Sequence, residues 1–179
     1  DRDQIIRRIL KGQGTPVYSV IPPQNTFWSN PHVADPGAGL TSEERVNQAK
    51  MTLQKAGYSW IGAHLILPDG HEMEQMKILT TRGWQKPFRL KTALEIKKAL
   101  SKIGIPVSTR MQSLHQTIAL LRKGDFDACI MGWANLSEDP DYLKTFFHSR
   151  EARPGGKNYA RFRNAAFDDL AERASRETD

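Results

Sequence analysis

Three stretches of the chain combine side chains that could bind a ligand, and each comes directly after a run of residues typical of a β-strand. They are residues 80–84 (TTRGW), residues 110–113 (RMQS) and residues 132–135 (GWAN). Because such runs end at these stretches, the side chains are expected to project from strand ends rather than from the middle of a core.

The residue types in these stretches suit the recognition of a polar organic molecule. The indole rings of Trp84 and Trp133 could stack on a planar or apolar part of a ligand. Gln112 and Asn135 could form neutral hydrogen bonds, and Arg82 could pair with an acidic group. The alternative is that the tryptophans pack beneath loops and that Arg82 is a solvated surface charge.

The periodicity of the surrounding sequence predicts a β-α-β-α-β order. Strands are expected over residues 76–80, 105–109 and 127–131, and amphipathic helices over residues 88–103 and 113–123. Helices of this length act as crossovers between parallel strands. The predicted fold class is therefore α/β with a parallel sheet, in which ligands bind beyond the carboxyl ends of the strands.

The flanking segments show clear start and stop signals. A helix is expected over residues 1–11, then a loop over 12–40 with one short strand near residues 17–20. In that loop Phe27 and Trp28 are expected to dock on the body of the protein. Residues 58–72 are predicted to be a loop.

Helix caps are predicted at four further positions. Thr41 with Glu44 and Ser113 with Gln116 have the spacing of a capping box. Asp139, followed by Pro140, is expected to cap a helix that ends near Phe147, and Asn164 is expected to cap the last helix.

Length and composition indicate a folded globular domain. The 179 residues fit one domain, and 39% hydrophobic with 26% charged residues is too apolar for a disordered chain. No run approaches the ~20 apolar residues of a membrane helix. Cys129, the single cysteine, lies in an apolar run and is expected to be a buried, inert thiol.

The net charge of +6 leaves a basic nucleic-acid-binding domain as an alternative. However, the basic residues are dispersed and mostly stand at helical spacing opposite apolar residues, which is typical of solvated faces. A nucleic-acid interface would require them to gather on one surface.

Catalytic and metal-binding patterns are weak. The five histidines show no metal-ligand spacing, and the sequence has no nucleophile elbow, Walker loop or dinucleotide fingerprint. A hydrolase would have to use Ser113 and His115, which are two residues apart on one predicted helix and do not face each other. No catalysis, metal or cofactor is therefore expected.

Five stretches together resemble one known family. They are "DRDQIIRRILKGQGTPVYSVIPP", "RVNQAKMTLQKAGY", "LKTALEIKKALSKIGIPVSTR", "LRKGDFDACIMGWANLSEDPDYLKTFFHS" and "NYARFRNAAFDDLAERA". In this order and spacing they are similar to the second lobe of extracytoplasmic solute-binding proteins of ABC importers, in the dipeptide/oligopeptide-binding family (solute-binding family 5).

The resemblance implies a periplasmic-binding-protein type II-like lobe that closes with a first lobe on a solute. Residues 1–179 are then one lobe excised from a larger two-lobed protein. Its parts are a helix, a long loop, a second helix and a loop over 1–72, the core and a helix over 73–147, and a loop and helix over 148–179. The implied partners are a polar solute and a membrane permease, and the implied location is periplasmic or extracellular with membrane anchoring.

One position departs from the pattern of the peptide-binding members. These carry Gly-Trp-x-Ala-Asp after the third strand, and the aspartate binds the free amino group of the peptide. In the present chain Leu136 stands where that aspartate would be. The resemblance thus leaves open an oligopeptide or another polar solute, such as an oligosaccharide or a metal chelate.

Overall fold

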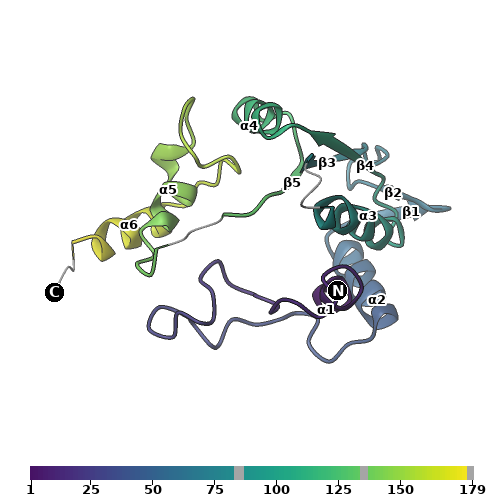
Figure 1. Cartoon of the computed structure of the whole chain (residues 1–179). Helices are drawn as coiled ribbons and strands as arrows, with labels where there is room; N and C mark the ends of the chain where they lie inside the picture. Colours follow the sequence, from purple (N-terminus) through teal and green to yellow (C-terminus); the bar gives the residue numbers. More distant parts are fainter. Residues whose placement is uncertain (83–86, 134–136, 177–179) are drawn as a thin grey trace. The chain divides into compact units, whose positions relative to one another are not determined.

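The computed structural model describes residues 1–82, 87–133 and 137–176. Strands and helices alternate between residues 76 and 130, and helices precede and follow this part of the chain (Figure 1). In chain order the elements are α1 (Arg2–Arg8), α2 (Ser42–Lys55), β1 (Ser59–Ile61), β2 (His64–Ile66), β3 (Met76–Thr81), α3 (Phe88–Ser101), β4 (Val107–Gln112), α4 (Leu114–Lys123), β5 (Ala128–Ile130), α5 (Tyr142–Phe147), the 3-10 helix η1 (Ser149–Glu151) and α6 (Ala165–Ala174).

These elements belong to two units with separate internal packing. The first unit comprises Asp1–Pro16, Ala34–Thr117 and Phe126–Met131. The second comprises Val17–Val33, Ile118–Asp125 and Gly132–Asp179. Each unit is described below by itself.

A three-stranded sheet in the order β4-β3-β5 forms the centre of the first unit. β3 pairs in parallel with both neighbours, and Thr81 at its end stands opposite Gln112 of β4. The predicted parallel β-α-β-α-β core is thereby confirmed. β4 begins two residues later than predicted because Pro106 has no N–H to donate; its carbonyl instead accepts from the N–H of Met76 at 2.9 Å.

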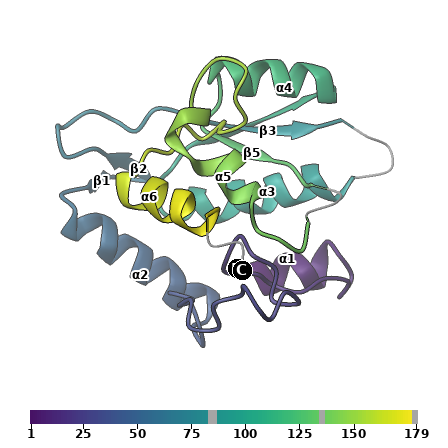
Figure 2. The same ribbon diagram turned by 90° about the vertical axis from the view of Figure 1, so that its left-hand side faces the viewer.

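Helix α3 covers one face of this sheet, and α1 and α2 lie on the far side of α3 (Figure 2). The core contact joins Ile78 of β3, Ala93 of α3 and Val107 of β4, all of which are buried. Ala93 is fully buried, so its small side chain lets the helix approach the sheet closely.

Residues 58–72 were predicted to be a loop, which is wrong, since β1 and β2 form an antiparallel hairpin there. The hairpin is held to the end of α3. The indole Nε1–H of Trp60 donates to the carbonyl of Ile103 at 2.9 Å, and the N–H of Leu65 donates to the carbonyl of Gly104 at 3.1 Å. Long-range bonds of this kind stabilise strands that are too short to be marked by periodicity.

Three of the four predicted caps are confirmed. Thr41 with Glu44 forms a complete capping box, the hydroxyl of Ser113 accepts from the N–H of Gln116, and the side chain of Asn164 accepts from the N–H of Phe167. Asp139 does not cap α5: its carboxylate accepts from the N–H of Asp141 at 3.0 Å, in a turn that precedes the helix. A proline at position 140 therefore belongs to this turn and not to the first turn of α5.

The loop predictions for residues 12–40 fail in two respects. No strand forms at residues 17–20. Phe27 does not dock, because it is 84% exposed and its ring contacts Trp28 edge to face at 5.0 Å between centroids. Trp28 itself is 45% exposed. The presence of aromatic residues in this loop was therefore not a sign that their side chains are buried.

The second unit is held together by aromatic rings and by a buried amide. Phe147, Phe162 and Phe167 meet edge to face, with centroids 5.7–6.2 Å apart. The side chain of Asn158 donates to the carbonyls of Phe147, His148 and Phe162 and accepts from the N–H of Phe162. Among the described residues, no helix has the length and apolar character needed to cross a membrane.

Replacing Gly104 with alanine tests the contact between the hairpin and α3. A Cβ at this position would stand 2.9 Å from Ala63 O, Leu65 N and Trp60 Nε1, and the φ of +81° disfavours a side chain. Gly62 is the matched control, with φ +60° and no atom within 4 Å of its Cβ position. Gly62→Ala is expected to cost about 1 kcal/mol and Gly104→Ala a further 1–3 kcal/mol, roughly, in urea unfolding. Equal losses would show that the close approach contributes nothing.

The acid stability of the second unit is expected to depend on two carboxylates of α6. Hydrogen bonds from Ser149 lower the pKa of Asp168 from its usual 3.8, and the Lys144 ammonium, followed by the charges of Arg150 and His148, lowers the pKa of Glu172 from its usual 4.5. Groups with a lowered folded-state pKa stabilise above the unfolded pKa, and this stabilisation is lost as the pH falls through the lowered value.

The melting temperature should therefore fall as the pH drops below about 4.5, and it should fall less in Glu172→Gln than in the unaltered protein. Asp169→Asn is the control, since Asp169 is on the same helix with a side chain that is 69% exposed. An unchanged acid slope in Glu172→Gln would contradict the prediction.

Candidate functional site

Arg82 and Gln112 lie together at the carboxyl edge of the parallel sheet. The N–H of Arg82 donates to the carbonyl of Gln112 at 2.5 Å, which continues the ladder one step beyond β3 and β4. Within the described part of the chain, the guanidinium of Arg82 forms no ion pair and the side-chain amide of Gln112 forms no hydrogen bond. Both groups are thus available to a ligand at the edge where the sequence predicted one.

Arg89 adds a second cation at this edge, which sequence reasoning missed. It is half-buried in the first turn of α3, and its guanidinium donates to the hydroxyl of Thr81 at the end of β3. The first turn of α3 contains no acidic residue. A cation is unfavourable at the positive end of a helix dipole. The presence of Arg89 in a first turn without an acidic residue was therefore the sequence signal that could have marked it as a candidate site residue.

Cys129 lies on β5 and does not have the properties of a nucleophile. Burial raises the pKa of its thiol, and the positive charge of Arg89 only partly opposes this effect. The thiol is therefore protonated at neutral pH, in agreement with an inert cysteine, although Cys129 is half-buried and not buried as predicted.

Trp133, three residues beyond the end of β5, stacks on another aromatic ring and is still partly exposed. In the second unit its indole stacks on the ring of Phe146 with the centroids 4.4 Å apart and the planes inclined by 26°. Trp133 nevertheless remains 50% exposed. The side chain is therefore not a core plug, and the stacked ring of Phe146 restricts its orientation.

Phe146 is itself part of a small platform in the second unit. Its ring lies 6.1 Å from that of Tyr142 on the same helix, and the hydroxyl of Tyr142 donates weakly to the carbonyl of Val20 at 3.4 Å. The side chain of Asn25 donates to the carbonyl of Glu138 at 2.5 Å. The loop of residues 17–33 is thus tied to the segment that leads into α5.

Three of the predicted ligand-binding residues lie outside the described residues. They are Trp84, Asn135 and Leu136. Their predicted roles stay predictions.

A serine hydrolase arrangement is absent from this edge as the structure describes it. The hydroxyl of Ser113 is engaged in the cap of α4, where it donates to Oε1 of Gln116 at 2.9 Å. His115 is exposed and forms no bond with Ser113. Across residues 1–82, 87–133 and 137–176, no group of three or more His, Cys, Asp or Glu side chains could hold a metal ion.

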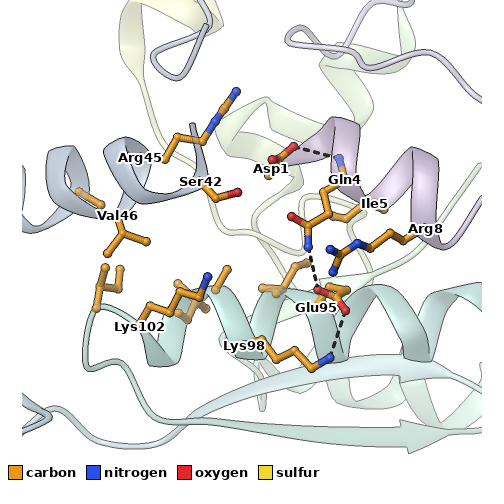
Figure 3. A pocket seen from close by; sticks show the side chains of 15 residues that line it. Asp1, Gln4, Ile5, Arg8, Ser42, Arg45, Val46, Glu95, Lys98 and Lys102 are labelled. Atoms are coloured by element: carbon orange, nitrogen blue, oxygen red, sulfur yellow. Dashed lines mark hydrogen bonds and ion pairs between the residues drawn. The ribbon is translucent and has the colours of Figure 1, made fainter. Parts of the chain in front are cut away.

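The first unit also contains a pocket of about 360 Å³ that is remote from the strand ends (Figure 3). It is lined by α1, by α2 and by the C-terminal half of α3, whereas the carboxyl edge lies near the N-terminus of α3. The carboxylate of Glu95, which lines this pocket, accepts a hydrogen bond from the side chain of Gln4 at 3.5 Å and forms an ion pair with Lys98 at 3.2 Å. The pocket is therefore distinct from the predicted ligand site at Arg82 and Gln112.

Comparisons with known proteins identify the family and the fold of the chain. Residues 1–154 match the family model of bacterial extracellular solute-binding proteins, family 5 Middle. The oligopeptide-binding protein AppA of Bacillus subtilis is 30% identical over 176 residues, which are 97% of this chain and 31% of AppA. The structure of AppA in complex with a nonapeptide has a TM-score of 0.82 over the whole of this chain and 34% of AppA, at 29% identity.

Two further solved structures share the fold. DppA from Helicobacter pylori in complex with the peptide STSA has a TM-score of 0.78 at 25% identity, over the whole of this chain and 31% of DppA. NikZ from Campylobacter jejuni in complex with Ni(L-His) also has a TM-score of 0.78, over the whole of this chain and 34% of NikZ, but at 16% identity it supports the fold alone.

The family model covers most of the chain, and the chain spans about a third of the length of the relatives that it matches. The predicted periplasmic-binding-protein type II-like architecture is confirmed, and the nucleic-acid alternative has no support from these relatives. The chain belongs to family 5 of the bacterial extracellular solute-binding proteins.

Proposed function

We propose that residues 1–179 form one lobe of the substrate-binding component of an ABC importer, which binds an oligopeptide or a similar polar solute in a cleft between two lobes. The observation that carries this proposal is the state of Trp133. It lies three residues beyond the end of β5, its ring stacks on Phe146, and it is 50% exposed. An aromatic ring fixed in this way is suited to stack on a solute.

The carboxyl edge of the sheet, described within the first unit by itself, carries polar groups that are also suited to bind a solute. Gln112 would hydrogen-bond neutral groups of the solute, and Arg82 would pair with an acidic group. Arg89 adds positive charge close to the edge, although its bond to Thr81 restricts its movement. A solute with a carboxylate and several amides would be complementary to these groups.

Two observations bear on the class of solute, and they favour different features of it. AppA and DppA, which were solved with peptides, are relatives at 29% and 25% identity. Leu136 stands where the peptide-binding members carry the aspartate that binds the free amino group, and a leucine cannot pair with an ammonium. The proposed solute is therefore an oligopeptide recognised without an anchored amino terminus, or a non-peptide such as an oligosaccharide or a metal chelate.

The remaining parts of the proposal follow from the family. The first lobe of the same protein would supply the opposite wall of the cleft, and a membrane permease would receive the solute. The intact protein would act outside the cytoplasm, in the periplasm or anchored at the extracellular face of the membrane. The engaged hydroxyl of Ser113 and the protonated thiol of Cys129 support binding without catalysis.

Replacing Trp133 with alanine in the intact protein tests the stacking role. Affinity for a synthetic nonapeptide, measured by calorimetry, is expected to fall about tenfold or more, because the variant loses the apolar area that the indole would bury as well as the about 0.5–1.5 kcal/mol that stacking adds. The melting temperature should change little, since the side chain is half exposed.

Phe27→Ala is the matched control for this experiment. Phe27 is also an exposed aromatic residue of the second unit but does not follow a strand of the sheet. It should leave both affinity and stability unchanged. If Trp133→Ala lowers the melting temperature and binds the peptide with unaltered affinity, Trp133 is a structural residue and the proposed wall is wrong.

The leucine at position 136 predicts tolerance of a blocked amino terminus. A nonapeptide and its N-acetylated form should bind to the intact protein with affinities that differ by less than about threefold, because no carboxylate is expected to bind the ammonium. Introducing the acid, Leu136→Asp, should restore a preference for the free amine. A strong preference for the free amine in the unaltered protein would show that another acidic residue has taken over this role.

A further inference from the structure

A second pocket, of about 230 Å³, lies within the second unit and is lined by four arginines. Arg122 comes from the last turn of α4, Arg153 from the loop after η1, and Arg161 and Arg163 from the segment that leads to α6. None of the ten residues that line the pocket carries a carboxylate. Like charges brought together in this way repel each other unless an anion compensates them.

The arginines are held in place by bonds to backbone carbonyls. Arg161 donates to the carbonyl of Lys123 at 2.9 Å, Arg153 to that of Arg150 at 3.1 Å, and Arg163 to that of Ala152 at 3.4 Å. Each guanidinium has five N–H donors, so these single bonds leave most donors unused. Arg122 has no hydrogen-bond or ion-pair partner within the described part of the chain.

The backbone around the pocket is built to a fixed shape. Arg161 has a φ of +53°, in the left-handed region that a residue with a side chain rarely adopts. Its guanidinium lies against Gly124, where a Cβ would stand 2.5 Å from Nη2. The buried side chain of Asn158, with its three donated bonds and one accepted bond, fixes the loop on either side of it.

We infer that this pocket binds a phosphate- or sulfate-class oxyanion. A tetrahedral oxyanion offers several acceptor oxygens for the unused donors, and its two negative charges would offset part of the positive charge of the four guanidinium groups. The anion could be carried by a free small molecule or by the headgroup of an anionic lipid. The site uses residues other than Trp133, Gln112 and Arg82, so it is independent of the proposed solute cleft.

Arg122→Gln is the direct test, because it removes a lining charge whose side chain supports no backbone carbonyl among the described residues. Lys123→Gln is the matched control: it removes the same charge from the same turn of α4 at a residue that does not line the pocket. Binding of inorganic phosphate to the intact protein, measured by calorimetry at constant ionic strength with chloride as reference, should weaken about tenfold in Arg122→Gln and little in Lys123→Gln.

Vesicles containing phosphatidylglycerol, compared with neutral phosphatidylcholine vesicles, provide the second arm of the experiment. If Arg122→Gln loses binding to the anionic vesicles and no protein binds inorganic phosphate, the oxyanion belongs to a lipid headgroup. If Arg122→Gln loses binding to inorganic phosphate and vesicle binding is unchanged, the oxyanion is a free anion. If Arg122→Gln unfolds, Arg163→Gln replaces it in both arms. Equal behaviour of the arginine variant and Lys123→Gln in both arms would overturn the inference.

Discussion

The parallel pairing of β3 with both β4 and β5 is the constraint on which the rest of the first unit depends. Because β3 is bonded on both sides and its last residues are buried, every side chain of the sheet has a fixed register. Thr81 then stands opposite Gln112, and Arg82 continues the ladder. The same pairing fixes where β5 ends and therefore where the chain leaves the sheet toward Trp133.

A binding protein requires rigid elements behind a small number of exposed groups, and the two units provide these separately. In the first, α3 packs through Ala93 on the sheet and presents Arg89 near its carboxyl edge. In the second, Phe146 supports one face of Trp133 and leaves the indole half exposed.

The sequence was sufficient to predict the features that depend on local chemistry. The β-α-β-α-β order follows from periodicity, and the caps at Thr41, Ser113 and Asn164 follow from the spacing of short polar side chains. The hairpin of β1 and β2 was missed because it depends on a bond from Trp60 to Ile103, 43 residues away. Phe146 beneath Trp133 was missed for the same reason, whereas Arg89 left a signal in the sequence, a cation without an acid at the start of α3.

The intact protein is proposed to carry a small polar solute. The most direct test is mass spectrometry of the molecules released when the intact protein is purified without denaturant and then unfolded. We expect a peptide or another polar solute in an amount comparable to that of the protein, and its depletion from a parallel preparation of Trp133→Ala. The absence of any small molecule above the buffer blank, together with no binding of added peptides or sugars by calorimetry, would contradict it.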